Sequence, residues 1–143
     1  MSFTAKVWEW DCYDEREKLE KLYRLGFALV FLSTDAAEQK QQVDDCPFCY
    51  VWYEHCIHVI EFINVMGEFT EPLLMAKLRA LEQSFNGLTA DEMLCHTLVI
   101  FDTPGWQQIR QQSAELLSLL EWNLLAQYYG ELDTFKNCAS HND

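Results

Sequence analysis

Apolar residues recur at helical spacing along most of this chain, and five segments follow that pattern. The first, residues 12–32, opens with acid-to-base pairs four positions apart, in the orientation that stabilises an isolated helix. These pairs are Asp14–Lys18, Glu17–Lys21 and Glu20–Arg24. The segment is therefore predicted to be a helix. Its end, residues 27–32, is apolar throughout and could instead be a buried strand, because periodicity does not separate the two in short runs.

The densest apolar stretch, Cys46–Met66, is predicted to be the central helix. At 100° per residue, one face is apolar and a narrow polar stripe lies opposite. The apolar face contains Cys49, Trp52, Cys56, Val59, Ile60 and Ile63, and the stripe contains Glu54, His58, Glu61 and Glu68. Pro47 falls in the first turn, where proline is tolerated. Gly67 is expected to end the helix.

Capping residues predict the remaining helices. A short polar surface helix should follow Ser33 and Thr34, and three more are expected over residues 70–86, 90–101 and 104–129. The helix over residues 90–101 starts at a capping box formed by Thr89 and Glu92. Residues 97–101 are rich enough in β-branched side chains to leave a strand as the alternative.

The last predicted helix, 104–129, ends before Gly130 and is apolar around most of its circumference from Leu116 onward. Such a helix is buried inside a bundle or at a subunit contact, so the sequence is compatible with a homodimer. Residues 1–10 could be a short strand or an extended arm, and residues 131–143 form a polar tail. We expect one all-α domain, 1–143, of five or six helices. Its two central helices, 46–66 and 104–129, should cross.

Charge narrows the range of functions. Ten basic residues stand against 23 acidic ones, for a formal net charge of −13. Direct binding of nucleic acid or of an anionic membrane is not expected, because both depend on basic side chains. The N-terminus lacks the apolar region of a signal peptide, and no apolar run approaches the ~18 residues of a membrane span. A cytoplasmic protein is expected.

The same charge favours a non-catalytic binding or inhibitor protein that occludes a basic surface, such as that of a nucleic-acid-binding protein or a toxin. In charge and size alone the chain is similar to toxin immunity proteins and to phage or plasmid inhibitors of restriction and CRISPR systems. The residues predicted to contact such a partner are Asp44, Asp45, Glu54, His58, Glu61, Glu115 and Glu121.

Cysteines supply the second candidate function, a zinc-stabilised structural or adaptor domain. The CxxC of Cys46 and Cys49 and the CxxH of Cys138 and His141 together make a Cys₃His ligand set. Thiol redox chemistry at the CxxC is the alternative, but no βαβ pattern surrounds it and the preceding segment is acidic. The cysteines could also be small buried hydrophobic residues.

The remaining motifs do not indicate a specific function. The segment LVIFDTPGW, residues 98–106, is similar to the DTPG switch of GTPases, but no GxxxxGK[ST] loop precedes it, so Thr103-Pro104 is interpreted as a helix start. Glu54, His58 and Glu61 could present three metal ligands, yet the His-x-x-Glu order reverses that of di-metal bundles and no second copy exists. No nucleophile motif is present. The chain is therefore not expected to be an enzyme.

Overall fold

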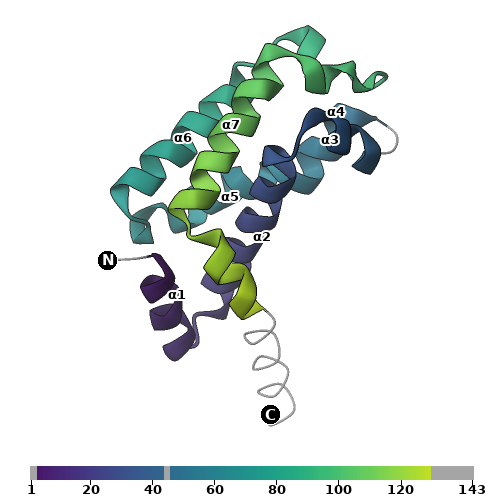
Figure 1. Ribbon diagram of the computed structural model, residues 1–143. Helices are drawn as coiled ribbons and strands as arrows, with labels where there is room; N and C mark the ends of the chain where they lie inside the picture. Colours follow the sequence, from purple (N-terminus) through teal and green to yellow (C-terminus); the bar gives the residue numbers. More distant parts are fainter. Residues whose placement is uncertain (1–2, 44–45, 130–143) are drawn as a thin grey trace.

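The computed structural model describes residues 3–43 and 46–129 (Figure 1). Its elements, in chain order, are α1 (Phe3–Cys12), α2 (Arg16–Ser33), α3 (Ala36–Gln42), α4 (Pro47–Val51), the π-helical turn η1 (Trp52–Cys56), α5 (Ile57–Met66), the 3₁₀ turn η2 (Gly67–Phe69), α6 (Pro72–Asn86), the 3₁₀ turns η3 (Ala90–Met93) and η4 (Leu98–Asp102), and α7 (Pro104–Leu119). A further helical stretch spans 122–129. The described ranges contain no strand, which confirms the all-α prediction with slightly more helices than expected.

The centre of the bundle is α2. It packs most extensively against α7 and α5, and α6 lies beside α7 on the outer side (Figure 1). Leu22, Leu25, Leu29 and Leu32 on α2 are fully buried. The prediction that segments 46–66 and 104–129 cross at the centre is therefore wrong, because α2 occupies that position.

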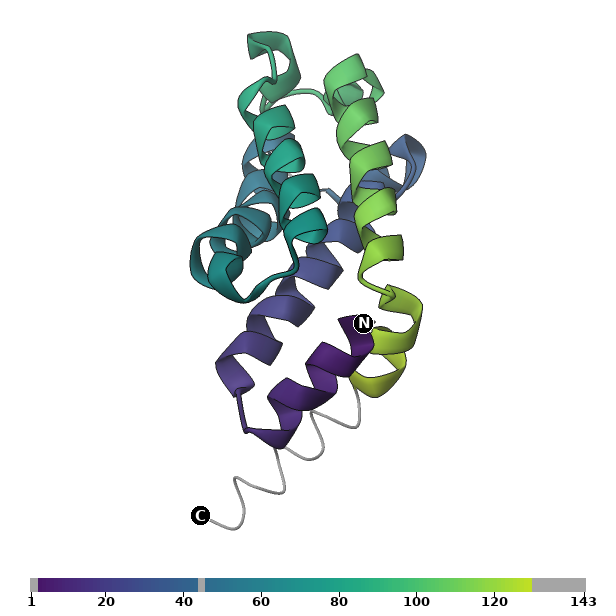
Figure 2. The same cartoon turned by 90° about the vertical axis from the view of Figure 1, so that its left-hand side faces the viewer.

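Residues 3–12 form an α-helix, α1, and not the strand or extended arm that the sequence suggested. A turn with Asp14 at φ 57° reverses the chain into α2. Val7 and Trp10 are buried, and the ring of Trp8 lies edge-on to Tyr128 with centroids 5.0 Å apart. Packing against the 122–129 helix therefore holds α1 in place (Figure 2).

The predicted helix 12–32 is confirmed, with its start moved to Arg16, and residues 27–32 are helical. Of the predicted ion pairs, Glu20–Arg24 forms at 2.6 Å. Lys21, expected to pair with Glu17, lies instead 3.6 Å from Glu61 on α5. This contact ties α2 to α5.

The central segment 46–66 is helical throughout but contains a π-helical turn at Trp52–Cys56. A π turn inserts an extra residue and rotates everything that follows relative to a uniform 100° pattern. The buried residues of the segment include Cys56, Val59 and Ile63 from the predicted face, together with Pro47, Val51, Phe62 and Met66 from outside it. The π turn also places His55 flat against Phe31, with ring centroids 4.0 Å apart.

The polar helix after Thr34 and the 70–86 helix are confirmed as α3 and α6, although Asp35 and Glu71 provide the caps. The predicted helix 90–101 is wrong. Its capping box forms, but only the 3₁₀ turns η3 and η4 follow, and residues 97–101 are not a strand. Loop 94–97 between the two turns is what carries Cys95.

The last predicted helix breaks after Leu119, because Glu121 adopts φ 57°, the left-handed region. The two halves, α7 and the 122–129 helix, point in different directions (Figure 2). Leu120, Trp122 and Leu125 are all buried in this chain. The break thus lets apolar residues from several sides of the predicted helix reach one core. Residues 131–143, predicted to be a polar tail, lie outside the described residues.

Within the described residues, no helix combines the length and the apolar character needed to cross a bilayer.

Candidate metal centre

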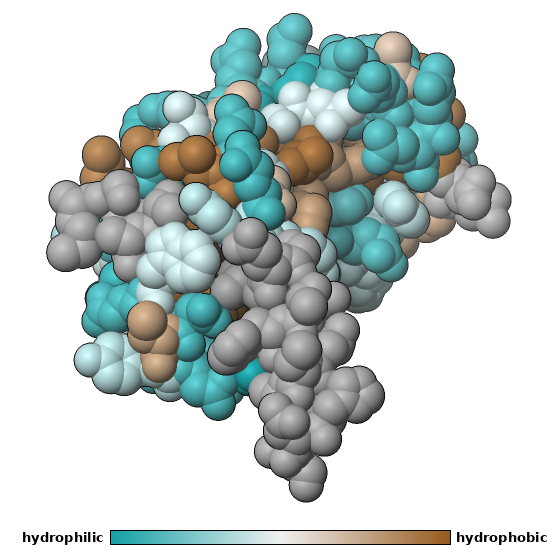
Figure 3. All heavy atoms as spheres, turned by 60° about the horizontal axis from the view of Figure 1, so that its bottom comes forward, coloured by the Kyte–Doolittle hydropathy of each residue, from teal (hydrophilic) through white to brown (hydrophobic). Residues whose placement is uncertain are grey.

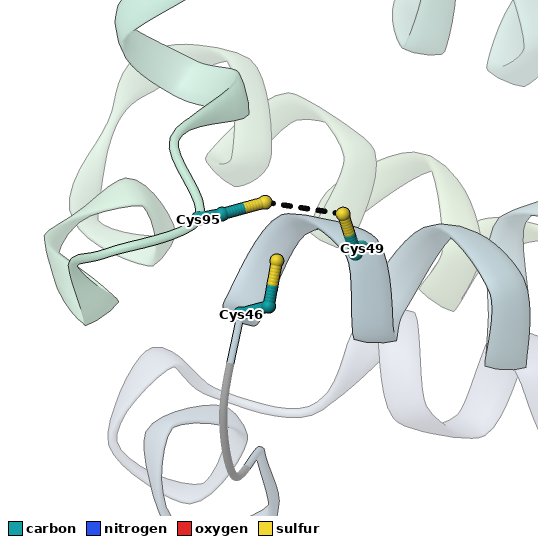
Figure 4. Close-up of side chains that lie close together, drawn as sticks. All are labelled: Cys46, Cys49 and Cys95. Carbon is teal, nitrogen blue, oxygen red and sulfur yellow. Dashed lines mark hydrogen bonds between the residues drawn. The ribbon is translucent and has the colours of Figure 1, made fainter.

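Three cysteines from distant parts of the chain meet at one end of the molecule. The sulfur atoms of Cys46, Cys49 and Cys95 all lie within 4.8 Å of one another. The Sγ atoms of Cys49 and Cys95 are 3.1 Å apart, and Figure 4 shows all three side chains turned toward a common point. No disulfide joins the cysteines of the described residues.

Two of the three thiols come from the start of α4. Cys46 is the residue before the helix and adopts φ 38° and ψ 71°, a left-handed conformation that is costly for a residue with a Cβ. Pro47 begins the helix, and Cys49 follows one turn after Cys46. Residues three apart share a helix face, so this geometry brings the two thiols of the CxxC together.

The third thiol is held by the loop after η3. The Trp106 indole donates a 2.8 Å hydrogen bond to the Glu92 carbonyl, which fixes η3 against the start of α7. Phe48 on α4 packs edge-on against the same indole, with centroids 6.5 Å apart. Trp106 therefore contacts the elements on both sides of the cluster, and Cys95 is brought to the CxxC.

Hydrogen bonds among the three thiols shift their pKa values in different directions. The bond to Cys95, followed by the bond to Cys46, raises the pKa of Cys49 to about 12. Thiol donation from Cys46 and then Cys49 lowers the pKa of Cys95, helped by backbone N–H groups of Cys49 and Phe48. The pKa of Cys95, which faces the start of α4 from another element, is thus lowered, whereas that of Cys49 is raised.

The donor set suits a soft or borderline metal ion. Thiolates select zinc, cuprous copper and iron–sulfur clusters over magnesium or calcium. In a tetrahedral zinc site with Zn–S bonds of ~2.3 Å, ligand sulfurs stand about 3.8 Å apart. The distances between the three cysteine sulfurs, from 3.1 Å to at most 4.8 Å, lie on both sides of that separation. Three cysteines in this arrangement could bind a metal.

The sequence identified two of these three residues as ligands. Cys46 and Cys49 belong to the cluster, whereas Cys138 and His141 lie outside the described residues. Cys95 was missed, because it stands 46 positions from Cys49 and was placed within a predicted helix. No local sequence signal points to it, because the predicted helix ends early only in the folded structure.

The predicted partner-contact residues do not form one cluster. Glu54 is exposed on the π turn, and Glu61 is engaged with Lys21 and lies 3.9 Å from the ring of His58. Glu115 on α7 forms a 2.7 Å ion pair with Lys77 on α6. Glu121 occupies the break before the 122–129 helix. Asp44 and Asp45 lie outside the described residues.

The surface at the α1 end of the molecule has a mixed character. Seen from the end where α1 lies, hydrophilic side chains predominate, with hydrophobic ones between them (Figure 3). Of the carboxylates with a proposed role, Glu54 forms no ion pair within the described residues. The carboxylate stripe of the central helix is thus partly neutralised inside the chain.

The motif that resembles a GTPase switch has a structural role here. Asp102 pairs with Lys40 of α3 at 2.6 Å, and the Thr103 hydroxyl donates to the Ile100 carbonyl. The backbone N–H of Gly105 donates to the Glu92 carboxylate at 2.6 Å. These contacts anchor the start of α7, as the interpretation of Thr103-Pro104 as a helix start predicted.

Comparisons of this chain with protein-family models, with curated proteins and with solved structures found no match.

Proposed function

We propose that this protein is a zinc-stabilised structural or adaptor domain, in which one zinc ion joins the start of α4 to the loop 94–97. The observation that carries the proposal is the convergence of Cys46, Cys49 and Cys95 within 4.8 Å. A structural zinc ion contributes its binding free energy directly to folding. It would therefore stabilise a region built of short 3₁₀ turns and a five-residue helix, α4.

Zinc is favoured over redox catalysis for two reasons. The raised pKa of Cys49 opposes its use as a CxxC nucleophile, whereas a bound metal ion deprotonates its thiol ligands outright. The left-handed backbone at Cys46 also positions one thiol of the group. Strained conformations of this kind concentrate at functional sites.

A tetrahedral zinc ion takes four ligands, and the cluster supplies three. Cys138 and His141 remain the predicted source of the fourth, but the 122–129 helix, after which they follow in the sequence, lies at the other end of α7 from α4 (Figure 1). That helix has 16 residues and is about 24 Å long. Nine residues, 130–138, span at most about 30 Å when fully extended. That span barely exceeds the length of α7 before the 122–129 helix is counted, so we expect water or His96 to complete the coordination.

Metal analysis tests the proposal. The full chain, purified without a histidine tag and under reducing conditions, should contain about one zinc per chain. Cys95→Ser should lose it, while Cys12→Ser, which removes an exposed thiol of α1, should retain it. Zinc that is absent from the wild-type chain and is not taken up on addition would overturn the proposal.

A second function, occlusion of a basic partner surface, is proposed on the net charge of −13 and the exposed, unpaired Glu54. Such binding weakens steeply with salt. The test is a pull-down from host extract at low and high ionic strength, with Glu54→Gln as the variant and Glu17→Gln, an exposed glutamate of α2, as the matched control. A partner held equally well at both salt concentrations would contradict the electrostatic mechanism.

A further inference from the structure

We propose that the same cluster is also a thiol-oxidation site, in which a peroxide converts Cys49 and Cys95 into a disulfide when no metal is bound. This inference shares residues with the proposed zinc site but does not require that zinc binds. It assigns the oxidisable pair to Cys49 and Cys95, across two elements, and not to the CxxC pair within α4.

Geometry selects this pair. The Sγ atoms of Cys49 and Cys95 are already in contact at 3.1 Å, and a disulfide brings two sulfurs to about 2.05 Å. Both cysteines are only partly buried, so a small oxidant can reach them. Cys56, by contrast, is the last residue of the π turn and is fully buried, which shields it from such a reagent.

The chemistry balances with hydrogen peroxide as the oxidant. The thiolate of one cysteine attacks a peroxide oxygen, so that an S–O bond forms, the O–O bond breaks and hydroxide leaves. Hydroxide takes up the proton released by that thiol and becomes water. The second thiol attacks the sulfenic sulfur, forming the S–S bond and expelling the oxygen as a second water, which carries the second thiol proton. Two thiols are oxidised and one peroxide is reduced to two waters.

The site can therefore hold either a zinc ion or the Cys49–Cys95 disulfide, but not both. Zinc needs both sulfurs as thiolates, and a disulfide sulfur no longer serves as a thiolate ligand. Oxidation should therefore release the metal, and bound metal should protect the pair. In either state the start of α4 stays linked to the loop 94–97.

Peptide mapping tests the inference on the full chain. The protein is reduced, stripped of metal with a chelator, treated with equimolar hydrogen peroxide, alkylated and digested with trypsin. Cleavage after Lys40, Lys77, Arg79 and Arg110 places Cys49 and Cys95 in separate peptides, 41–77 and 80–110. We expect these two peptides to be disulfide-linked and to separate on reduction. The link should be absent in Cys49→Ser and retained in Cys46→Ser and Cys12→Ser.

Other outcomes overturn the inference. A disulfide confined to peptide 41–77 would assign the chemistry to the CxxC, and sulfinic acids without any cross-link would show that the pair does not close. If Cys49→Ser fails to fold, fragmentation of the linked wild-type peptides by tandem mass spectrometry still decides, because it locates the disulfide at Cys46, Cys49 or Cys56 within peptide 41–77. Repeating the reaction with added zinc separates the two proposals: a cross-link that zinc does not slow leaves the oxidation site intact and argues against zinc binding. Zinc binding without any cross-link after metal removal refutes only the oxidation site.

Discussion

The indole ring of Trp122 lies directly against the backbone of Gly26, in the space that a Cβ atom would take. Tyr23 and Phe27 flank the same ring, with centroid distances of 5.7 Å and 5.3 Å. Gly26 thus creates the notch in α2 that receives the first residue of the 122–129 helix. This contact fixes the chain after the break at Glu121.

Gly26→Ala should therefore destabilise the fold. The added methyl group must displace an indole whose residue is only 8% exposed, and overpacking of this kind costs about 1–3 kcal/mol. Urea unfolding followed by circular dichroism measures the loss. Gly67→Ala is the matched control, because its nearest neighbour would be the Met75 methyl group at 3.8 Å, an ordinary contact. Equal stability of the two variants would show that Trp122 is not seated on Gly26.

Local sequence patterns were sufficient to predict the fold class. Acid-to-base pairs four positions apart predicted α2, and capping residues predicted α6. The break at Glu121 carries no glycine or proline, so nothing local marks it. Tertiary packing of Trp122 onto Gly26 is the physical reason for it, and a single sequence does not reveal that contact.

The candidate site was predictable only where its residues are close in sequence. Cys46 and Cys49 form a CxxC, and the adjacent Pro47 indicates a helix start. Cys95 joins them through the packing of Phe48 and Trp106, which depends on the folded arrangement of α4 and α7. The π turn, which aims His55 at Phe31, is likewise a result of packing and has no sequence signal.

Glu92 should contribute to stability through its charge. Its carboxylate is buried, which raises its pKa, but hydrogen bonds from Thr89 and Gly105 outweigh burial and lower the pKa overall. A carboxylate whose pKa is lower in the folded state stabilises the fold above its unfolded pKa, and loses that effect as pH falls through the folded value. Glu92→Gln should cost about 1–3 kcal/mol near neutral pH, as expected for hydrogen bonds to a charged group.

The matched control for Glu92→Gln is Asp91→Asn, which removes one negative charge from an exposed neighbour. Urea unfolding near pH 7 and again well below the ordinary pKa of glutamate, at about pH 3, should show the deficit of Glu92→Gln shrinking in acid. A deficit that is independent of pH would assign the effect to shape and not to charge.

His55 should make the fold sensitive to mild acid. Burial, with a smaller effect of nearby His58, lowers the pKa of His55 from 6.5 to about 4. The folded state therefore holds the neutral ring, and its stability declines as pH falls from the unfolded pKa toward the folded one. His55→Phe keeps the stacking on Phe31 but cannot ionise. Between near-neutral pH and about pH 5 it should lose less stability than the wild type.

The control for His55→Phe is His96→Gln, an exposed histidine in the loop 94–97, which should follow the wild-type pH profile. Thermal unfolding at both pH values gives the comparison. If the stability of His55→Phe and of the wild type changed equally with pH, His55 would take up a proton as readily in the folded state as in the unfolded state.

Zinc should raise the thermal stability of the reduced chain, and the response should depend on the three cysteines of the cluster. At a free zinc concentration a hundred times Kd, binding to the folded state alone adds about 2.7 kcal/mol, or roughly 10 °C in Tm for a chain of this size. Cys46→Ser, Cys49→Ser or Cys95→Ser should each greatly reduce the shift, because each removes one of the three thiolate ligands that converge on the site. Cys12→Ser should retain it in full.

The same measurement identifies the fourth ligand. If Cys138 or His141 completes the site, the double variant Cys138→Ser/His141→Ala needs more zinc to reach the same Tm shift, because a three-ligand site binds more weakly. It keeps a partial response, since the three thiolates remain. A response identical to the wild type would contradict the predicted ligand set and leave water or His96 in the fourth position. Differential scanning fluorimetry across a zinc titration, run in parallel on His96→Gln, distinguishes these cases.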